Sequence, residues 1–467
     1  MKLLAVLTCA LVLALGSEPA LGYPLDGYEQ TGIQRLEAYR LAQTGEVRGR
    51  VLPPGGRLSI DSIALGLVDH PDFQIPPPDA ELEAAIQTLL GEDADGYALA
   101  VLDLTDPAHP RYAAHNAKRQ QNPGSVGKLM VALGWFQALA DIYPDDIQAR
   151  HDLMRNTRHT ADAFIRKDSH KVPFWQPGDT EVDYRPIREG DEGNLWTWLD
   201  WMASSSSNAA ASTVMEQLIL LHHFGAKYPV SQSVAEKFFK ETSKSKLSSI
   251  FSEAIQTPIG RNDLDLAALR QGSFFTREGK SRVPGTNSVS TPLELLRFVI
   301  KMEKGQLVDP YSSLEIKRLI YLSEGRIRYA SSPALRSSAL YFKSGSLYSC
   351  KSEPGFECGK YMGNVVNYLN SVTMVETNEP DSKLRYVVVL LSNVLRKNSA
   401  EVHKKLATEI HRIMEGYAAF RAEASGSSEV EPAGNVGSGA PATGQVIDEI
   451  DTDEEHERID GIAPDAE

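Results

Sequence analysis

The 467-residue sequence predicts an α/β fold of the α+β kind: one antiparallel sheet formed from both ends of a main domain, flanked by helices, with an all-helical lobe inserted. Strand-like segments occur early, at 97–104 and 112–115, and then only late, at 339–343, 365–375 and 384–391. The stretch between them, 125–306, has mostly helical patterns. Because consecutive strands tend to be neighbours, the simplest topology is a single sheet with a cleft between sheet and lobe.

The main domain is expected to span residues 79–422. It begins with a helix at 80–90, followed by the two early strands. It ends with an amphipathic helix at 400–420, which carries Leu406, Ile410 and Met414 on one face. The two terminal helices should therefore cover one face of the sheet.

The first residues, 1–22, are interpreted as a signal peptide. A charged start is followed by an apolar run and by Ala20-Leu21-Gly22, which fits a cleavage site before Tyr23. An uncleaved anchor is the alternative, but the run is short for a membrane span. The mature protein is therefore expected in the periplasm or outside the cell, with no transmembrane segment after cleavage.

An N-terminal extension, 23–78, precedes the main domain. It contains one amphipathic stretch at 33–42 and breaks rich in Pro and Gly at 51–56 and 76–78, which read as linkers or surface turns. The extension is too short for an independent domain to be expected, and its sequence indicates no specific role.

Charge is concentrated at the other end of the chain. The formal net charge is -14, and from Ala424 onward twelve acidic residues stand against one basic residue, Arg458. With few apolar residues, the segment 423–467 is predicted to be a disordered acidic tail. The folded part is close to neutral, so no basic face for nucleic acid is expected.

Two cysteines remain after removal of the signal region, Cys350 and Cys358. The Pro354-Gly355 turn between them would place them opposite each other on a hairpin, so a disulfide is predicted. Two free thiols are the alternative. Neither these residues nor the pair His222-His223 forms a plausible zinc site, and no metal or cofactor is expected.

A candidate nucleophile lies at Ser125. The apolar residues that follow it predict a largely buried helix that starts at or near the serine. Lys128 would then lie one turn later on the same face of that helix. A serine hydroxyl needs an adjacent base, and a lysine amine can serve when its surroundings lower its pKa. The alternative is an ordinary helix cap at Ser125 with a solvated lysine.

A second element, Ser206-Ser207-Asn208, lies between a Trp-rich helix and another helix. Ser206 could pass a proton to a leaving group, and Asn208 could hold a substrate amide. The alternative is a polar turn in which Asn208 caps the next helix.

A third element, Lys343-Ser344-Gly345, lies on a predicted strand. Lys343 and Ser344 would offer a cation and a hydroxyl to a substrate carboxylate, and Gly345 permits close approach of another backbone. The N–H of Ser346 could form an oxyanion hole with that of Ser125.

In order and spacing, these elements resemble the S-x-x-K, S-D-N and K-T-G motifs of the class A β-lactamase and penicillin-binding protein superfamily, with Ser for Asp in the second and Ser for Thr in the third. The resemblance covers 79–420. It implies that Ser125 is acylated, that Lys128 is its base, that Ser206 shuttles protons, and that Asn208, Lys343 and Ser344 position substrate.

One part of the class A pattern is missing. Those enzymes carry a glutamate that directs water onto the acyl-enzyme, with an asparagine four residues later, and no glutamate between Asn208 and Thr291 has that spacing. Glu241, Glu253 and Glu278 are the available candidates, and none is convincing. Without a positioned base the acyl-enzyme should persist, as in penicillin-binding proteins.

The leading prediction is a monomeric exported serine hydrolase of class A β-lactamase type, acting through an acyl-Ser125 intermediate on β-lactams or related peptidoglycan stem peptides. The first alternative is a penicillin-binding D,D-peptidase or esterase with slow deacylation. The second is a non-catalytic protein that binds β-lactams or muropeptides.

Overall fold

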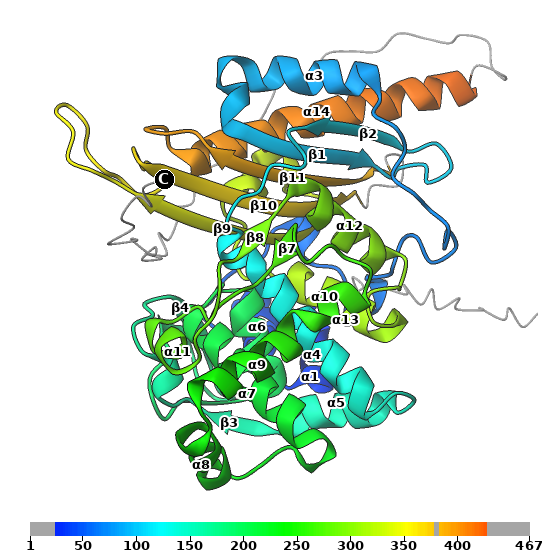
Figure 1. The fold of residues 1–467 in the computed structure, drawn as a ribbon. Helices are drawn as coiled ribbons and strands as arrows, with labels where there is room; N and C mark the ends of the chain where they lie inside the picture. The colour runs from blue at the N-terminus through cyan, green and yellow to red at the C-terminus, as the bar shows by residue number, and fades with distance from the viewer. Residues whose placement is uncertain (1–23, 378–382, 427–467) are drawn as a thin grey trace, which may run out of the picture.

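The computed structural model describes residues 24–377 and 383–426 (Figure 1). The predicted signal peptide and nearly all of the predicted acidic tail lie outside these residues. The last helix, α14 (Ser399–Gly426), continues past its predicted end and into the first residues assigned to the tail. Across the described ranges, no helix combines the length and the apolar character that a membrane span needs.

A five-stranded antiparallel sheet forms the centre of the molecule, in the order β2-β1-β11-β10-β9. The early and late strands of the sequence pair directly, which confirms the predicted fold class. The strands are β1 (Tyr97–Asp103), β2 (Arg111–His115), β9 (Ala339–Ser349), β10 (Val366–Glu376) and β11 (Arg385–Asn393).

The sheet separates two hydrophobic cores, one on each face. Successive side chains of a strand point to opposite faces, so alternate residues of each strand belong to different cores. In β1, Leu99 and Val101 pack into one core, whereas Ala100 and Leu102 pack into the other. The first core is closed by α3 (Ala80–Leu90) and α14, which lie together on one side of the sheet (Figure 1). As predicted, the two terminal helices cover the same face.

The helical lobe packs against the opposite face (Figure 1). Its helices are α4 (Lys128–Ile142), α5 (Ile147–Asn156), α6 (Leu195–Ala203), α7 (Asn208–Phe224), α8 (Gln232–Glu241), α9 (Lys244–Ile255), α10 (Thr257–Arg261), α11 (Arg277–Arg282), α12 (Pro292–Glu303) and α13 (Pro310–Tyr321). Three short strand pairs, which the helical pattern of this region did not predict, are interleaved with them. They are formed by β3 (Arg158–Thr160), β4 (Lys171–Phe174), β5 (Asp183–Pro186), β6 (Glu192–Asn194), β7 (Leu269–Arg270) and β8 (Val289–Ser290).

The N-terminal extension packs into the lobe. Its helices are α1 (Tyr28–Thr31) and α2 (Gln34–Thr44), and in α2 the side chains of Leu36 and Tyr39 are fully buried. Both belong to the same core as α4 and α6. The predicted break at 51–56 contains the short 3-10 turn η2 (Pro54–Gly56), and a second 3-10 turn, η3 (Ile60–Ser62), follows it. The extension therefore shares the main hydrophobic core.

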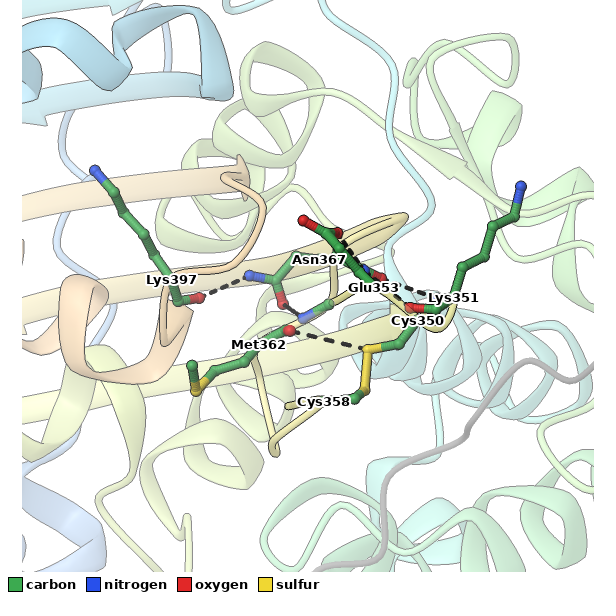
Figure 2. The surroundings of a disulfide bond; sticks show 9 residues. Cys350, Lys351, Glu353, Cys358, Met362, Asn367 and Lys397 are labelled. Atoms are coloured by element: carbon green, nitrogen blue, oxygen red, sulfur yellow. Dashed lines mark hydrogen bonds between the residues drawn. A yellow bond between two sulfur atoms is a disulfide. The ribbon is translucent and has the colours of Figure 1, made fainter. Parts of the chain in front are cut away.

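The predicted disulfide between Cys350 and Cys358 is present (Figure 2). It closes a small hairpin, in which Glu353 pairs with Phe356 around a glycine of positive φ at Gly355. This hairpin follows directly after β9. It therefore extends the strand that carries the third motif.

Candidate active site

The three sequence motifs lie on separate elements that meet at the β9 edge of the sheet. Ser125 lies in the 3-10 turn η5 (Gly124–Gly127), and Lys128 is the first residue of α4. Ser206 lies in the turn between α6 and α7, and Lys343 lies in the edge strand β9. Hydrogen bonds connect all three elements, so the structure brings the predicted residues into one site.

Lys128 connects the first two motifs. Its Nζ donates hydrogen bonds to Ser125 Oγ and to Asn208 Oδ1, both at 2.9 Å, and another to the backbone carbonyl of Ser206. The residue is only 1% exposed. An amine held against a serine hydroxyl in a buried site is the arrangement that serine activation by lysine requires.

Lys343 connects the third motif to the second. Its Nζ donates to Ser206 Oγ at 2.8 Å, and the same hydroxyl lies 3.4 Å from Lys128 Nζ. The Ser206 hydroxyl therefore lies between two amines. A hydroxyl in that position can receive a proton on one side and deliver one on the other.

Gly345 allows β9 to approach the nucleophile. A Cβ at this position would lie 2.4 Å from the backbone nitrogen of Ser125 and 2.4 Å from the carbonyl oxygen of Pro123. On the other side of the contact, a Cβ on Gly124 would come within 3.3 Å of the nitrogen of Ser346. The two backbones are thus close enough to bring the Ser125 and Ser346 amides to one place, as an oxyanion hole needs.

The turn that holds Ser206 has an unusual backbone. Ser206 has a φ of 58°, which a residue with a side chain rarely adopts. Ser207, not Asn208, is the N-cap of α7, and its Oγ accepts from the Ala210 N–H at 3.1 Å. The alternative in which Asn208 caps this helix is therefore wrong, and the Asn208 side chain contacts Lys128 instead.

A carboxylate that the sequence did not indicate supports this turn. Asp168 Oδ2 accepts from Ser207 Oγ at 2.9 Å and from the Ala209 N–H at 2.8 Å, and its other oxygen contacts His170 Nδ1 at 2.5 Å. The second motif has Ser207 where the family motif has Asp. Asp168 brings a negative charge to the same helix N-terminus, where it is favourable.

The surroundings of Asp168 favour its ionised form. Burial alone would raise its pKa, but His170, the Ala209 N–H and the positive charge of Lys128 together lower the pKa of Asp168 to about 2. Asp168 is thus a buried anion close to the amine of Lys128.

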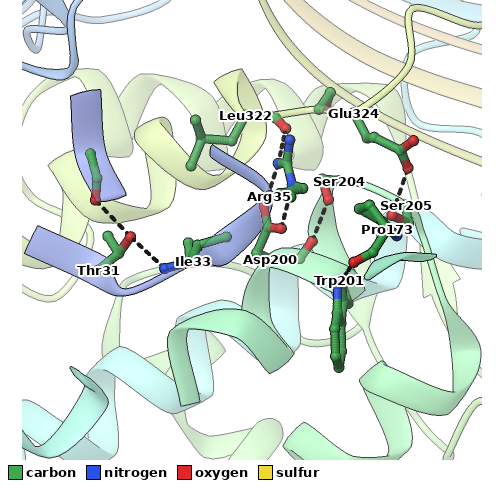
Figure 3. A network of polar contacts seen from close by, with 12 residues as sticks. Thr31, Ile33, Arg35, Pro173, Asp200, Trp201, Ser204, Ser205, Leu322 and Glu324 are labelled. Atoms are coloured by element: carbon green, nitrogen blue, oxygen red, sulfur yellow. Dashed lines mark hydrogen bonds and ion pairs between the residues drawn. The ribbon is translucent and has the colours of Figure 1, made fainter. Parts of the chain in front are cut away.

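A second network supports the turn from the side of the N-terminal extension (Figure 3). Arg35 of α2 makes two hydrogen bonds to Asp200 of α6 and one to the Leu322 carbonyl. Glu324, which follows α13, accepts from Ser205 Oγ at 2.7 Å and from Tyr39 OH at 3.1 Å. The residue directly before Ser206 is therefore anchored to this network.

Arg328 is a further site residue that the sequence did not indicate. Its Nη1 donates to Ser344 Oγ at 2.7 Å, and its Nη2 donates to Ser346 Oγ at 3.4 Å and to Tyr361 OH at 3.0 Å. It has a positive φ of 56° and is mostly buried. No motif surrounds Arg328 in the sequence, and only the folded chain brings it beside Ser344.

None of the three candidate glutamates pairs with Ser125 or Lys128 in the structure. Glu253 pairs with His222, Glu278 with Arg282, and Glu241 with Lys237. Beside Lys128 lies an aromatic ring instead, with the centroid of Phe275 4.8 Å from Nζ. Phe275 is buried, so this side of the site is apolar.

No family model and no curated protein matches the chain. Among solved structures, a PBP-A variant captured as its acyl-enzyme complex with penicillin G is similar over 73% of this chain and 100% of its own, with a TM-score of 0.46 at 12% identity. A β-lactamase from Chitinophaga pinensis is similar over 72% of this chain and 99% of its own, with a TM-score of 0.41 at 14% identity. Both are similarities of fold at low sequence identity, and no residue role is taken from them.

Proposed function

We propose that the protein is a serine hydrolase that forms an acyl-enzyme at Ser125 with β-lactams or with peptides ending in acyl-D-Ala-like groups. The observation that carries the proposal is the 2.9 Å contact between Lys128 Nζ and Ser125 Oγ, in a site that also contains Ser206, Asn208 and Lys343. Each group has a distinct chemical role.

In the acylation step, the Lys128 ammonium first loses a proton to solvent. The neutral amine then takes the proton of Ser125 Oγ as the oxygen attacks the carbonyl carbon of the scissile amide. The amides of Ser125 and Ser346 stabilise the oxyanion. As the C–N bond breaks, Ser206 gives its proton to the leaving nitrogen and regains one from Lys128 or Lys343. The product is an ester on Ser125.

Arg328, Lys343 and Ser344 recognise the substrate carboxylate. Two cations and a hydroxyl lie along one short segment of β9, since Lys343 contacts Ser206 Oγ and Arg328 contacts Ser344 Oγ at the next position of the strand. Charge-assisted hydrogen bonds of this kind suit a carboxylate. This favours substrates that carry a free carboxylate next to the scissile amide.

Slow deacylation is part of the proposal. The carboxylate near Lys128 is that of Asp168, whose oxygens are already engaged by Ser207, the Ala209 N–H and His170, and the ring beside the Lys128 amine is that of Phe275. Hydrolysis of the ester needs a base that activates water. This observation favours the penicillin-binding D,D-peptidase over an efficient β-lactamase. Export to the periplasm or the exterior, where these substrates occur, belongs to the same proposal.

A stopped-flow experiment with a chromogenic cephalosporin tests this function. The expected result is a burst of one chromophore per enzyme, followed by a much slower steady rate. A linear trace with no burst and fast turnover would indicate an efficient β-lactamase. No reaction above that of the Ser125→Ala variant would reject the acyl-enzyme altogether.

A further inference from the structure

A cavity of about 510 Å³ lies within the helical lobe, between β3, α7, α8, α9 and α11. Ser125, Lys128, Ser206, Asn208, Lys343 and Ser344 are not among its lining residues. Its volume is in the range of small-molecule sites. The cavity is therefore separate from the candidate active site.

The floor of this cavity contains buried polar atoms with no hydrogen-bond partner. Glu216 of α7 is 3% exposed, and its Oε2 has no partner among the described residues; the same holds for Nε2 of His159. These two atoms are 3.7 Å apart. Burying a carboxyl oxygen without a partner is unfavourable, so two such atoms side by side at a cavity floor indicate a missing ligand group.

The His159 ring is held in place for this role. It packs against Trp198 with ring centroids 5.9 Å apart, and the Trp198 indole N–H donates to the His159 carbonyl at 3.3 Å. Burial lowers the pKa of His159 to about 4, which favours a neutral imidazole at pH 7 with one ring nitrogen able to accept a hydrogen bond.

Glu216 is poised to accept a cation. Burial, together with the nearby carboxyl of Asp162, raises the pKa of Glu216 well above its usual range, while Arg282 and the Gln217 side chain act in the opposite direction. Asp162 itself has a pKa raised by burial. A ligand ammonium would supply the positive charge that lets these carboxyls ionise.

The exposed residues that line the cavity carry mostly positive charge. Arg158, Lys240 and Lys244 line it, and all three are exposed. Basic side chains at the mouth and carboxyls at the floor match a ligand with a cationic end and an anionic end. Glu236 is the one acidic rim residue among the described lining residues.

We propose that this cavity is a second binding site, which takes a small amino acid-like ligand with its ammonium group between Glu216 and His159 and its carboxylate at the basic rim. The ammonium donates to Glu216 Oε2 and to the imidazole nitrogen. This site does not depend on the function proposed for Ser125.

Isothermal titration calorimetry of the full chain with 6-aminohexanoate, hexylamine and hexanoate tests the proposal. We expect saturable binding of 6-aminohexanoate, at least tenfold weaker binding of hexylamine, and no binding of hexanoate. Absence of binding by both amines, or equal binding of hexanoate, would overturn the assignment, since the cavity would then hold only water or an unselective ligand.

Two variants complete the test. Glu216→Gln keeps the side-chain shape but cannot ionise, and should weaken 6-aminohexanoate at least tenfold. Glu253→Gln, on exposed α9 surface outside the cavity, should leave its affinity unchanged. Both variants should keep the circular dichroism spectrum and the unfolding temperature of the unmodified protein, which shows that they are folded and keeps this result independent of the active-site proposal. Unchanged affinity in Glu216→Gln would contradict the assignment.

Discussion

The guanidinium of Arg35 donates two hydrogen bonds to the carboxylate of Asp200, at 2.6 Å from Nε and 2.5 Å from Nη2, and both side chains are buried. This pair joins the N-terminal extension to α6, the helix that ends at the Ser206 turn (Figure 3). Charge pairing, rather than apolar contact alone, thus fixes the extension to the element that carries the second motif.

Removing one partner of this pair should destabilise the whole domain. Arg35→Met leaves the Asp200 carboxylate buried without its cation, which typically costs about 3–5 kcal/mol. Urea unfolding of the full chain measures the loss. As a control, Arg40→Met removes the partly exposed pair with Glu37 on the same helix and should cost less than about 1 kcal/mol. Equal losses in the two variants would contradict the structural role of the extension.

Asp168 should make the stability of the Ser206 turn depend on pH. Its folded-state pKa of about 2 lies below the ordinary value of 3.8, so the ionised group stabilises the fold above about pH 4 and loses that effect as the pH falls towards 2. Asp168→Asn should therefore cost about 2 kcal/mol at pH 7, and the difference from the unmodified protein should shrink in acid.

Acylation tests whether Asp168 also positions the site. Asp168→Asn should slow acylation of Ser125 by about tenfold or more, because Ser207 and the Ala209 N–H lose their ionised acceptor. Asp179→Asn, which changes an exposed carboxylate that accepts from the Gln176 N–H, is the matched control. An acylation rate in Asp168→Asn equal to that of the control would remove Asp168 from the positioning network.

The apolar wall at Phe275 should control the lifetime of the acyl-enzyme. Phe275→Glu puts a carboxylate near Lys128, where it can ionise beside a cation and activate water. Deacylation should then accelerate by about 10²-fold or more. Phe275→Leu keeps the wall apolar and should leave the lifetime within about twofold, and an equal acceleration in this variant would show that loosened packing, not a base, is responsible.

The disulfide should support substrate recognition through Tyr361. Tyr361 follows the Cys350–Cys358 hairpin and accepts a hydrogen bond from Arg328, which in turn holds Ser344. The double variant Cys350→Ser with Cys358→Ser should lose about 2–3 kcal/mol of stability. It should raise the concentration of β-lactam needed for half-maximal acylation, with a smaller effect on the maximal rate. An effect confined to the maximal rate would contradict this link.

The sequence predicted the sheet and the proximity of Ser125 to Lys128, because both depend on local patterns. The strand around Val387 is a continuous apolar run, and Ser125 and Lys128 are separated by one helical turn. Asp168 and Arg328 could not be predicted, since their importance comes from contacts with residues distant in the sequence. The ion pair of Arg35 could not be predicted for the same reason, because its partner Asp200 lies 165 residues away in the chain. Asp200 also lies in a helix where the tryptophans dominate the sequence pattern.

Peptide mapping by mass spectrometry after incubation with an isotopically labelled penicillin tests the central claim most directly. We expect one labelled peptide, containing Ser125, whose mass increases by that of the intact penicillin and which persists for many minutes. The label should be absent from Ser125→Ala and strongly reduced in Lys128→Met, because the base that takes the serine proton is gone. A label on another residue, or an unlabelled Ser125 peptide in a fully folded protein that also shows no turnover, would contradict the proposed acyl-enzyme.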